Sequence, residues 1–198
     1  MTDFPTALPT PRTLPLRGGP ALRWGILAPG DIAKDFVHAV HTHTDQRVVA
    51  VASRSLDRAQ AFANRHGIER AYGDHSHLVD DADVDIVYVA SPHTEHKRLA
   101  LLAIEAGKHV LVEKPIALNL AQVDAVTDAA TRNDRFLMEA MWMRFNPAHI
   151  EMMKRIADGA IGEVRRVQAD FSFALPYSDD HRLWDRAKGG GALLDLGI

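Results

Sequence analysis

The most apolar short run of the chain, His109–Pro115 (HVLVEKP), ends in an acid, a base and a proline. Its first four residues are typical of a buried strand. Pro115 fixes its own φ angle and disfavours helix at Lys114, so the extended backbone stops there. Ligands bind at strand ends in open α/β sheets, and a lysine ammonium is a movable charge whose pKa shifts readily on partial burial. Lys114 is therefore a candidate proton donor. The alternative is a loop lysine that pairs with Glu113.

A glycine-containing turn, Ala28–Ala33 (APGDIA), separates a predicted strand from a predicted helix. Compared with the dinucleotide fingerprint G-x-G-x-x-G/A, it keeps the second glycine as Gly30, ends in the permitted alanine, and has Ala28 in place of the first glycine. Gly30 would let the backbone approach a pyrophosphate, which would rest on the helix N-terminus. A plain tight turn is the alternative. The candidate cofactor contacts are Pro29, Gly30, Asp31 and Ile32.

The residues after the second predicted strand indicate which dinucleotide would bind. An acid there would bond the ribose 2′-hydroxyl of NAD, but this chain has Ser53, Arg54 and Ser55, with Arg58 one helical turn later. A guanidinium flanked by hydroxyls suits a 2′-phosphate, so we expect NADP in preference to NAD, with Ser53 and Arg54 as contacts. The alternative is a solvated arginine beside a serine that caps the next helix.

A polar loop, Ser91–His96 (SPHTEH), follows the third predicted strand and should lie beside the nucleotide crevice. Thr94 suits a cap for the helix that follows. The histidines would contact the cofactor or simply form polar surface. The candidate cofactor contacts are Ser91, Pro92, His93 and His96.

Two histidine pairs, His41/His43 and His75/His77, raise the possibility of a zinc site. Side chains at positions i and i+2 of a helix do not share a face, and no thiol or obvious third ligand is nearby. We therefore expect no metal.

The composition argues against several other classes of protein. The 198 residues carry a net charge of −3 without a long basic run, so a nucleic-acid partner is not expected. No apolar run approaches the roughly 18 residues of a membrane span, so no membrane partner is expected either. The sequence has no cysteine, which excludes disulfides and thiol catalysis and fits a cytoplasmic location.

Short apolar runs alternate with helical patterns from Leu22 onward. Strands are predicted at 24–28, 48–52, 85–90, 109–112 and 136–139. Helices are predicted after each of the first four, the last of them near 119–133. Strands that are apolar without alternation are buried on both faces, which indicates a parallel sheet covered by helices.

The pattern changes after Asn146. Residues 147–158 are typical of a helix, and Glu163–Phe173 alternates apolar with polar residues, as in an antiparallel sheet with one wet face. We therefore expect a second domain at 146–198. Residues 1–21, rich in proline and glycine, are expected to be a disordered lead-in.

Together these segments resemble the Gfo/Idh/MocA family of NAD(P)-dependent oxidoreductases. The resemblance rests on GILAPGDIA (25–33), SPHTEH (91–96), VLVEKP (110–115) and GGGALLDLGI (189–198). MEAMWMRFNP (138–147) resembles the branch of dimeric dihydrodiol dehydrogenases and NADP-dependent D-xylose dehydrogenases.

The resemblance implies a doubly wound Rossmann domain at 22–145 and the start of an α+β domain with a mainly antiparallel sheet. It implies hydride transfer between NADP or NAD and a sugar, polyol or dihydrodiol. Lys114 would hold the substrate hydroxyl and move its proton, with Asp195 as the second catalytic residue. The remaining expected cofactor contacts are Glu113, Lys114, Trp142 and Arg144.

One departure from the branch concerns the C-terminus. The branch has a tyrosine after DLGI that is thought to act in acid–base catalysis, and this sequence ends at Ile198. We therefore expect a truncated chain. The alternative function is a nucleotide-binding Rossmann module with little or no turnover. A homodimer is expected for a full-length relative and is doubtful for this chain.

Overall fold

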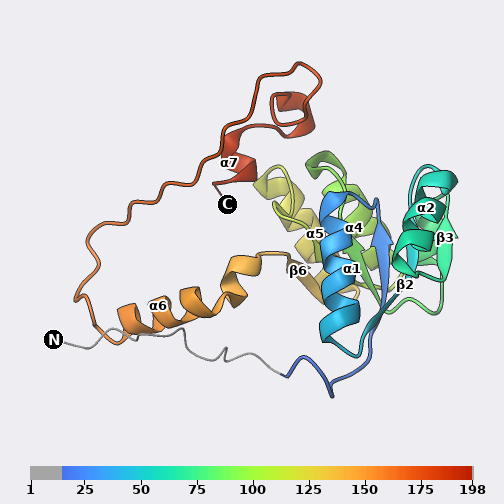
Figure 1. Cartoon of the computed structure of the whole chain (residues 1–198), viewed down its shortest axis with the longest axis horizontal. Coiled ribbons are helices and arrows are strands. Elements are labelled where there is room, and N and C mark those ends of the chain that lie inside the picture. The colour runs from blue at the N-terminus through green and yellow to red at the C-terminus, as the bar shows by residue number, and fades with distance from the viewer. Residues whose placement is uncertain (1–14, 198) are drawn as a thin grey trace. The chain divides into compact units, whose positions relative to one another are not determined.

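Six short strands form one parallel sheet in the order β3-β2-β1-β4-β5-β6 (Figure 1). The structure is a computed structural model and describes residues 15–197. The strands are β1 (Arg23–Leu27), β2 (Arg47–Ala52), β3 (Arg70–Tyr72), β4 (Ile86–Val89), β5 (His109–Val112) and β6 (Leu137–Glu139). The α-helices are α1 (Asp31–His43), α2 (Leu56–His66), α3 (His75–Val79), α4 (His96–Glu105), α5 (Leu120–Arg132), α6 (Pro147–Ala157) and α7 (Ala192–Asp195). Short 3₁₀ helices are η1 (His93–Glu95), η2 (Trp142–Phe145) and η3 (Arg186–Lys188).

The central strand β1 pairs with both β2 and β4. Ile26 of β1 lies opposite Val51 on one side and Tyr88 on the other. The chain winds from β1 outward to β3 and then returns to β4, so the direction of winding reverses between β1 and β4. In such sheets the ligand crevice lies at this switch point, outside the carboxyl ends of the strands. The turn after β1, the loop after β4 and Lys114 after β5 therefore share one edge.

Helices cover both faces of the sheet, and each face has its own core cluster. Successive strand residues point to opposite faces, so Ile26 packs on the face of α1 and α2 while Leu27 packs on the face of α3, α4 and α5. Both side chains are fully buried. This two-sided burial explains the uninterrupted apolar strands, and it confirms the predicted doubly wound α/β class.

The sequence analysis missed β3 and α3. The three residues of β3 are all half-buried, and α3 has five residues, so neither presents a long apolar period. Arg70 of β3 instead forms ion pairs of 2.9 Å with Asp81 and with Asp83. Charge pairs therefore help to hold this edge strand.

Contacts divide the chain into two units, and each is described by itself. The larger unit contains residues 16–140 together with 176–197, so the C-terminal segment with α7 belongs with the sheet. The other unit contains residues 141–175, with η2 and α6. The division at residue 146 that the sequence suggests stays a prediction.

The alternating segment Glu163–Phe173 is not a strand, which corrects the prediction. It has no regular secondary structure, and its apolar side chains are exposed, Val167 by 82% and Phe171 by 73%. A strand is held by hydrogen bonds to a neighbouring strand, and residues 15–197 provide none here. All strand pairs among the described residues are parallel.

Only part of the predicted lead-in is described. Residues 1–14 lie outside the described residues, and residues 15–21 have no helix or strand. Within that segment, Arg17 forms an exposed ion pair of 3.0 Å with Asp45.

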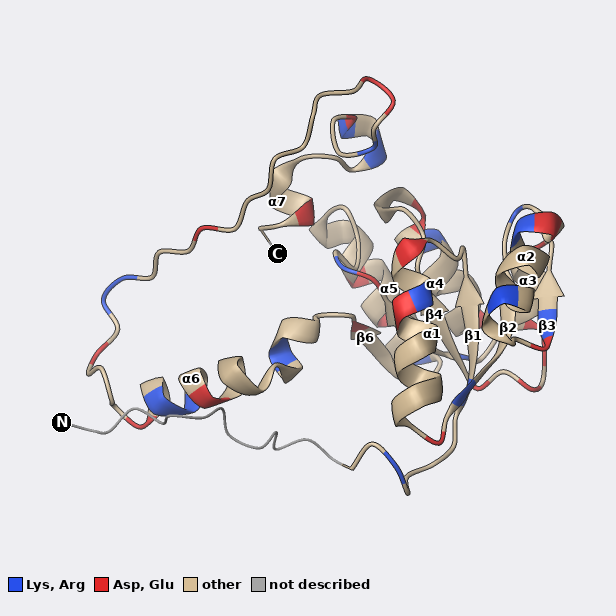
Figure 2. Ribbon diagram, viewed as in Figure 1, with Lys and Arg blue, Asp and Glu red and all other residues tan. Residues whose placement is uncertain are grey.

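Charged residues of both signs are distributed along the chain, and the longest helices of residues 15–197 have 13 residues. Figure 2 shows acidic and basic positions interspersed along the ribbon, with no long segment of one sign. Among residues 15–197, no helix is long and apolar enough to cross a membrane.

Candidate functional site

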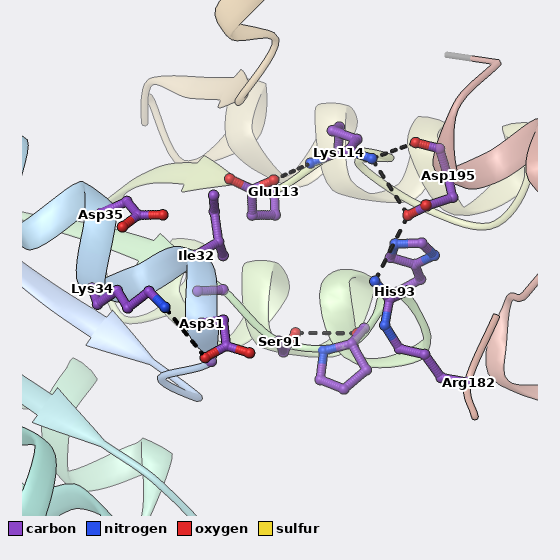
Figure 3. Close-up of a pocket in the computed structure, with 13 residues that line it drawn as sticks. Asp31, Ile32, Lys34, Asp35, Ser91, His93, Glu113, Lys114, Arg182 and Asp195 are labelled. Atoms are coloured by element: carbon purple, nitrogen blue, oxygen red, sulfur yellow. Dashed lines mark hydrogen bonds and ion pairs between the residues drawn. The ribbon is translucent and has the colours of Figure 1, made fainter. Parts of the chain in front are cut away.

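Two neighbouring cavities lie at the carboxyl edge of the sheet. The larger one, which we call the lysine cavity, has a volume of about 500 Å³ and is drawn in Figure 3. It lies between the turn after β1, the loop after β4, the end of β5 and the segment before α7. It is lined by Gly30, Asp31, Ile32, Lys34, Asp35, Ala90, Ser91, Pro92, His93, Glu113, Lys114, Arg182 and Asp195.

The ammonium of Lys114 is held by Asp195 across the lysine cavity. Lys114 Nζ donates to the backbone carbonyl oxygen of Asp195 and, at 3.5 Å, to its carboxylate Oδ1 (Figure 3). Arg182 Nη2 lies 3.7 Å from the same Oδ1. The side chains of Lys114 and Asp195 are 28% and 13% exposed, so water reaches the lysine while the carboxylate is shielded. The two residues expected to be catalytic are thus in contact.

Glu113 serves the backbone of Lys114 and not its ammonium. Glu113 Oε2 accepts a hydrogen bond of 3.2 Å from the Lys114 amide, while Oε1 accepts one of 2.5 Å from the Tyr88 hydroxyl. The alternative of a lysine paired with Glu113 is therefore wrong for the described residues. Burial raises the pKa of the Tyr88 phenol, and the Glu113 carboxylate raises it further, so the phenol remains a proton donor. The ring of Phe36 stacks on that of Tyr88 at 4.2 Å.

Two glycines of the run 189–191 allow close packing, Gly189 against the loops beside the sheet and Gly190 within the C-terminal segment itself. Gly189 has φ +73°, and an added Cβ would lie 2.6 Å from Leu118 Cδ2. At Gly190 an added Cβ would lie 2.5 Å from the carbonyl oxygen of Arg182. This is a backbone atom, so no side-chain rotation can relieve the contact. Gly190 is therefore required for the tight turn of residues 182–190 that precedes Asp195, and Gly189 is favoured by its positive φ.

His93 and His96 anchor the loop after β4 in different ways. His93 lines the lysine cavity, and its Nδ1 lies 3.2 Å from the carbonyl oxygen of Gly189. Burial lowers the pKa of His93. His96 is fully buried, with Nδ1 2.6 Å from the Pro115 carbonyl oxygen and Nε2 2.8 Å from that of Ser91. His96 thus connects two loops, and its expected contact with a cofactor stays a prediction.

In the turn after β1, the strained backbone conformation lies at Ala28. This residue has φ +59°, in the left-handed region that favours glycine, and its amide donates to the Ala52 carbonyl oxygen at 2.9 Å. Gly30, in contrast, is extended, with room for a Cβ at 3.5 Å from the nearest atom. Gly30 is the N-cap of α1 and provides no side-chain cap, so the amides of the first turn are available to an anion.

The second cavity, which we call the histidine cavity, has a volume of about 280 Å³. It is lined by Ala28, Arg54, His75, Ser91, Pro92, Thr94, Glu95, Leu99, Arg182 and Lys188. Three of these residues, Ser91, Pro92 and Arg182, also line the lysine cavity, so the two cavities adjoin. Basic residues outnumber acidic ones in its lining, which suits a ligand that carries phosphate.

The loop after β2 has both features expected from the sequence, an arginine available to a 2′-phosphate and a serine that caps the next helix. Arg54 is exposed and lines the histidine cavity, as a 2′-phosphate contact requires. Ser55 caps α2, because its Oγ accepts from the Arg58 amide at 3.4 Å. Ser53 is buried, and its Oγ accepts from the Ser55 amide at 3.4 Å, so Ser53 shapes the loop.

Some predicted contacts lie in the other unit, and some residues that line the cavities were not selected from the sequence. Trp142 and Arg144 lie on η2 in the other unit, so their expected contacts stay predictions. The sequence analysis did not select Arg182 or Lys188, although basic residues just before a glycine run were a usable signal. It considered His75 only as a metal ligand. Among residues 15–197 no group of three or more His, Cys, Asp or Glu side chains could hold a metal ion.

Comparison with protein families agrees with this geometry. Residues 22–141 match the family described as "Oxidoreductase family, NAD-binding Rossmann fold". Residues 149–198 match "GFO/IDH/MocA C-terminal domain".

The chain is also similar to individual proteins of known name or structure. A protein of Danio rerio named trans-1,2-dihydrobenzene-1,2-diol dehydrogenase is 47% identical over 180 residues, which are 90% of this chain and 53% of the relative. The human protein of that name is 42% identical over the same shares. This chain spans about half the length of these curated relatives. Among solved structures, KijD10, a 3-ketoreductase from Actinomadura kijaniata in complex with NADP and TDP-benzene, aligns with a TM-score of 0.81 and 34% identity over 90% of this chain and 55% of its own.

Proposed function

The chain belongs to the GFO/IDH/MocA family of oxidoreductases, and on that premise we propose that it transfers a hydride between NADP(H) and a CH–OH group of a sugar, a polyol or a dihydrodiol. One observation carries the proposal: Lys114 ends β5 in the wall of the same cavity as the Gly30 turn, with Asp195 beside its ammonium. A lysine ammonium suited to proton transfer and a helix N-terminus suited to phosphate thus face one space. The names of the relatives favour a dihydrodiol among these substrates.

The residues around the two cavities fit NADP. The uncapped N-terminus of α1 would receive the pyrophosphate, and Arg54 would receive the 2′-phosphate at the end of β2. No acid stands at that strand end to accept a bond from a free 2′-hydroxyl, which disfavours NAD.

The chain's own residues would manage the proton. When bound, the nicotinamide supplies or accepts the hydride. Lys114 Nζ has three N–H donors as an ammonium, and its two bonds to Asp195 leave a third for the substrate oxygen. In carbonyl reduction the ammonium donates a proton to the oxygen as the carbon gains hydride. In alcohol oxidation the amine form takes the hydroxyl proton as hydride leaves the carbon. Asp195 holds Lys114 in place for both directions.

A second candidate is a nucleotide-binding module with little turnover. The segment Glu163–Phe173 favours it, because the apolar residues expected in a substrate-side sheet are exposed and have no strand partner among the described residues. Both candidates bind NADPH. Only the first reduces NADP⁺ when a dihydrodiol or D-xylose is added, and oxidises NADPH when the corresponding carbonyl compound is added.

Titration of the purified chain with NADPH and with NADH, followed by nucleotide fluorescence, tests the cofactor preference. We expect tighter binding of NADPH and loss of the preference in Arg54→Asp. Arg65→Asp makes the same charge change in the last turn of α2 and should retain the preference. Equal affinity for both nucleotides in the wild type, or an unchanged preference in Arg54→Asp, would refute NADP specificity.

Location and assembly form part of the same proposal. We propose a cytoplasmic location and a homodimer for a full-length relative. Sedimentation of this chain and of a full-length relative, with and without NADPH, compares their assembly states.

A further inference from the structure

We propose that the imidazole ring of His75 recognises the adenine ring of the dinucleotide in the histidine cavity. The inference rests on the proposed binding of NADP and assigns a residue to its adenosine end. The sequence singled out His75 only for a metal site, which this placement replaces.

The first observation is an unpaired polar atom in a buried position. His75 is 7% exposed, and its Nε2 is buried without a hydrogen-bond partner among the described residues. Buried polar atoms in native proteins are nearly always hydrogen-bonded, so an exception calls for a ligand or another partner. The side chain lines the histidine cavity, where such a ligand would sit.

The walls of the cavity suit a flat heteroaromatic ring. Ala28, Pro92 and Leu99 provide apolar surface, and His75 provides a single polar edge. Apolar walls with a few placed polar groups are typical of small-molecule sites. An adenine edge offers ring nitrogens that accept and an amino group that donates, so either neutral tautomer of His75 finds a partner. Burial, with the nearby Arg98 and Arg54, lowers the pKa of His75 and so favours its neutral form.

The charged residues of the histidine cavity and its position beside the lysine cavity indicate that the ligand is a nucleotide. Arg54, Arg182 and Lys188 line the same cavity with Glu95 as the acid among them, a balance that favours phosphate beside the ring. Because the cavity adjoins the lysine cavity, one extended ligand can pass from His75 along the Gly30 turn to Lys114. The adenine then lies on the α3 side and the reactive ring lies beside Lys114.

Variants of His75 separate recognition from packing. His75→Phe keeps an aromatic ring and removes the hydrogen bond, and His75→Gln restores an amide that can donate or accept. His77→Phe is the matched control, since His77 is exposed on the same helix. Calorimetric titrations use NADPH, adenosine 2′,5′-bisphosphate for the adenosine half, and reduced nicotinamide mononucleotide for the other half.

We expect His75→Phe to weaken NADPH and adenosine 2′,5′-bisphosphate by the same factor, about three- to tenfold for one hydrogen bond. The mononucleotide should bind as in the wild type, His75→Gln should recover part of the affinity, and His77→Phe should change nothing. Unchanged NADPH affinity in His75→Phe, or an equal loss for the mononucleotide, would overturn the inference and leave the proposed function standing. A wild-type chain that binds no NADPH would overturn both.

A measurement on the wild type does not depend on how the variants fold. The imidazole nitrogen NMR signals of His75, assigned by their loss in His75→Gln, should shift when adenosine 2′,5′-bisphosphate is added and should stay in place with the mononucleotide. Signals unmoved at saturating adenosine 2′,5′-bisphosphate contradict the proposed contact.

Discussion

The hydroxyl of Tyr88 donates a 2.5 Å hydrogen bond to Glu113 Oε1, which ties the centre of the sheet to the residue before Lys114. Tyr88 stands on β4 and is 2% exposed, packed under Phe36. The other carboxylate oxygen of Glu113 accepts from the Lys114 amide. The position of Lys114 therefore depends on a polar group inside the apolar core.

Removal of the Tyr88 hydroxyl should loosen this connection. In Tyr88→Phe the Glu113 carboxylate loses a buried donor, and a hydrogen bond to a charged group contributes about 1.5–3 kcal/mol. We expect the free energy of unfolding in urea to fall by about 2 kcal/mol and NADPH affinity to fall with it. Tyr72→Phe is the control, because Tyr72 of β3 donates a 3.0 Å hydrogen bond to Asp81 and lies outside the lining of both cavities. It should lower stability without weakening NADPH, and equal losses of affinity in both variants would contradict a specific role for Tyr88.

The pairing of Tyr88 with Glu113 should also affect how stability depends on pH. The pKa of Tyr88 is raised above its ordinary value of 10.0, first by burial and then by Glu113, so the folded state favours the protonated phenol. This stabilisation is fully present below about pH 10 and is lost as the pH rises further, because the unfolded chain then releases a proton that the folded chain retains. We expect the free energy of unfolding to decline less steeply above pH 10 in Tyr88→Phe, by up to about 1.4 kcal/mol per pH unit. Parallel profiles for both proteins would show that the phenol is not protected.

Lys114 and Asp195 should stabilise each other. A double-mutant cycle with Lys114→Met and Asp195→Asn, measured by urea unfolding, isolates their interaction from the contact of Arg182 with the same carboxylate. We expect a coupling energy of about 1 kcal/mol, since Asp195 is shielded and Lys114 is partly exposed. The exposed pair of Lys154 on α6 and Asp158, the residue that follows this helix, is 3.6 Å apart and should couple more weakly. A coupling of zero for Lys114 and Asp195 would mean that the Asp195 carboxylate does not stabilise the Lys114 ammonium.

The fold was predictable from sequence where burial is two-sided. Val48–Ala52 gave a clear strand because side chains on both faces are apolar, whereas Arg70–Tyr72 gave none because that strand is half-buried and held partly by ion pairs. Glu163–Phe173 has the alternation of a strand, but alternation specifies a face and not a partner.

The residues of the candidate site were also predictable from sequence only in part. Gly30 and Lys114 were found from local motifs, since each stands at the end of a predicted strand. The contact between Lys114 and Asp195 spans 81 residues, so only the family resemblance suggested that the two belong together. The role proposed for His75 depends on an unpaired nitrogen and a cavity wall, and neither property has a sequence pattern.

Ala28 should be a site where glycine stabilises the protein. Its φ of +59° costs an alanine about 1–2 kcal/mol, whereas the greater freedom of glycine in the unfolded chain costs about 0.4–1 kcal/mol. Ala28→Gly should therefore raise the free energy of unfolding by about 0.5–1 kcal/mol, measured by urea unfolding without nucleotide. Ala33→Gly, inside α1, is the control of opposite sign and should lower stability by about 1 kcal/mol. A destabilised Ala28→Gly would contradict the strained turn.

Gly190 should control whether the C-terminal segment docks. In Gly190→Ala the new Cβ would lie 2.5 Å from the carbonyl oxygen of Arg182 and 2.7 Å from that of Leu183, so the backbone must move. Overpacking of this kind costs about 1–3 kcal/mol and distorts the turn of residues 182–190 that leads to Asp195. We expect faster hydrogen exchange in that segment, weaker NADPH binding and an unchanged exchange pattern in β1 and β4. Gly159→Ala also replaces a glycine of positive φ (+81°), but its Cβ would point into open space in the other unit, so it should leave residues 182–197 as they are. Because Asp195 reaches Lys114 only when this segment is docked, slow exchange in Gly190→Ala would contradict the packing that creates the lysine cavity.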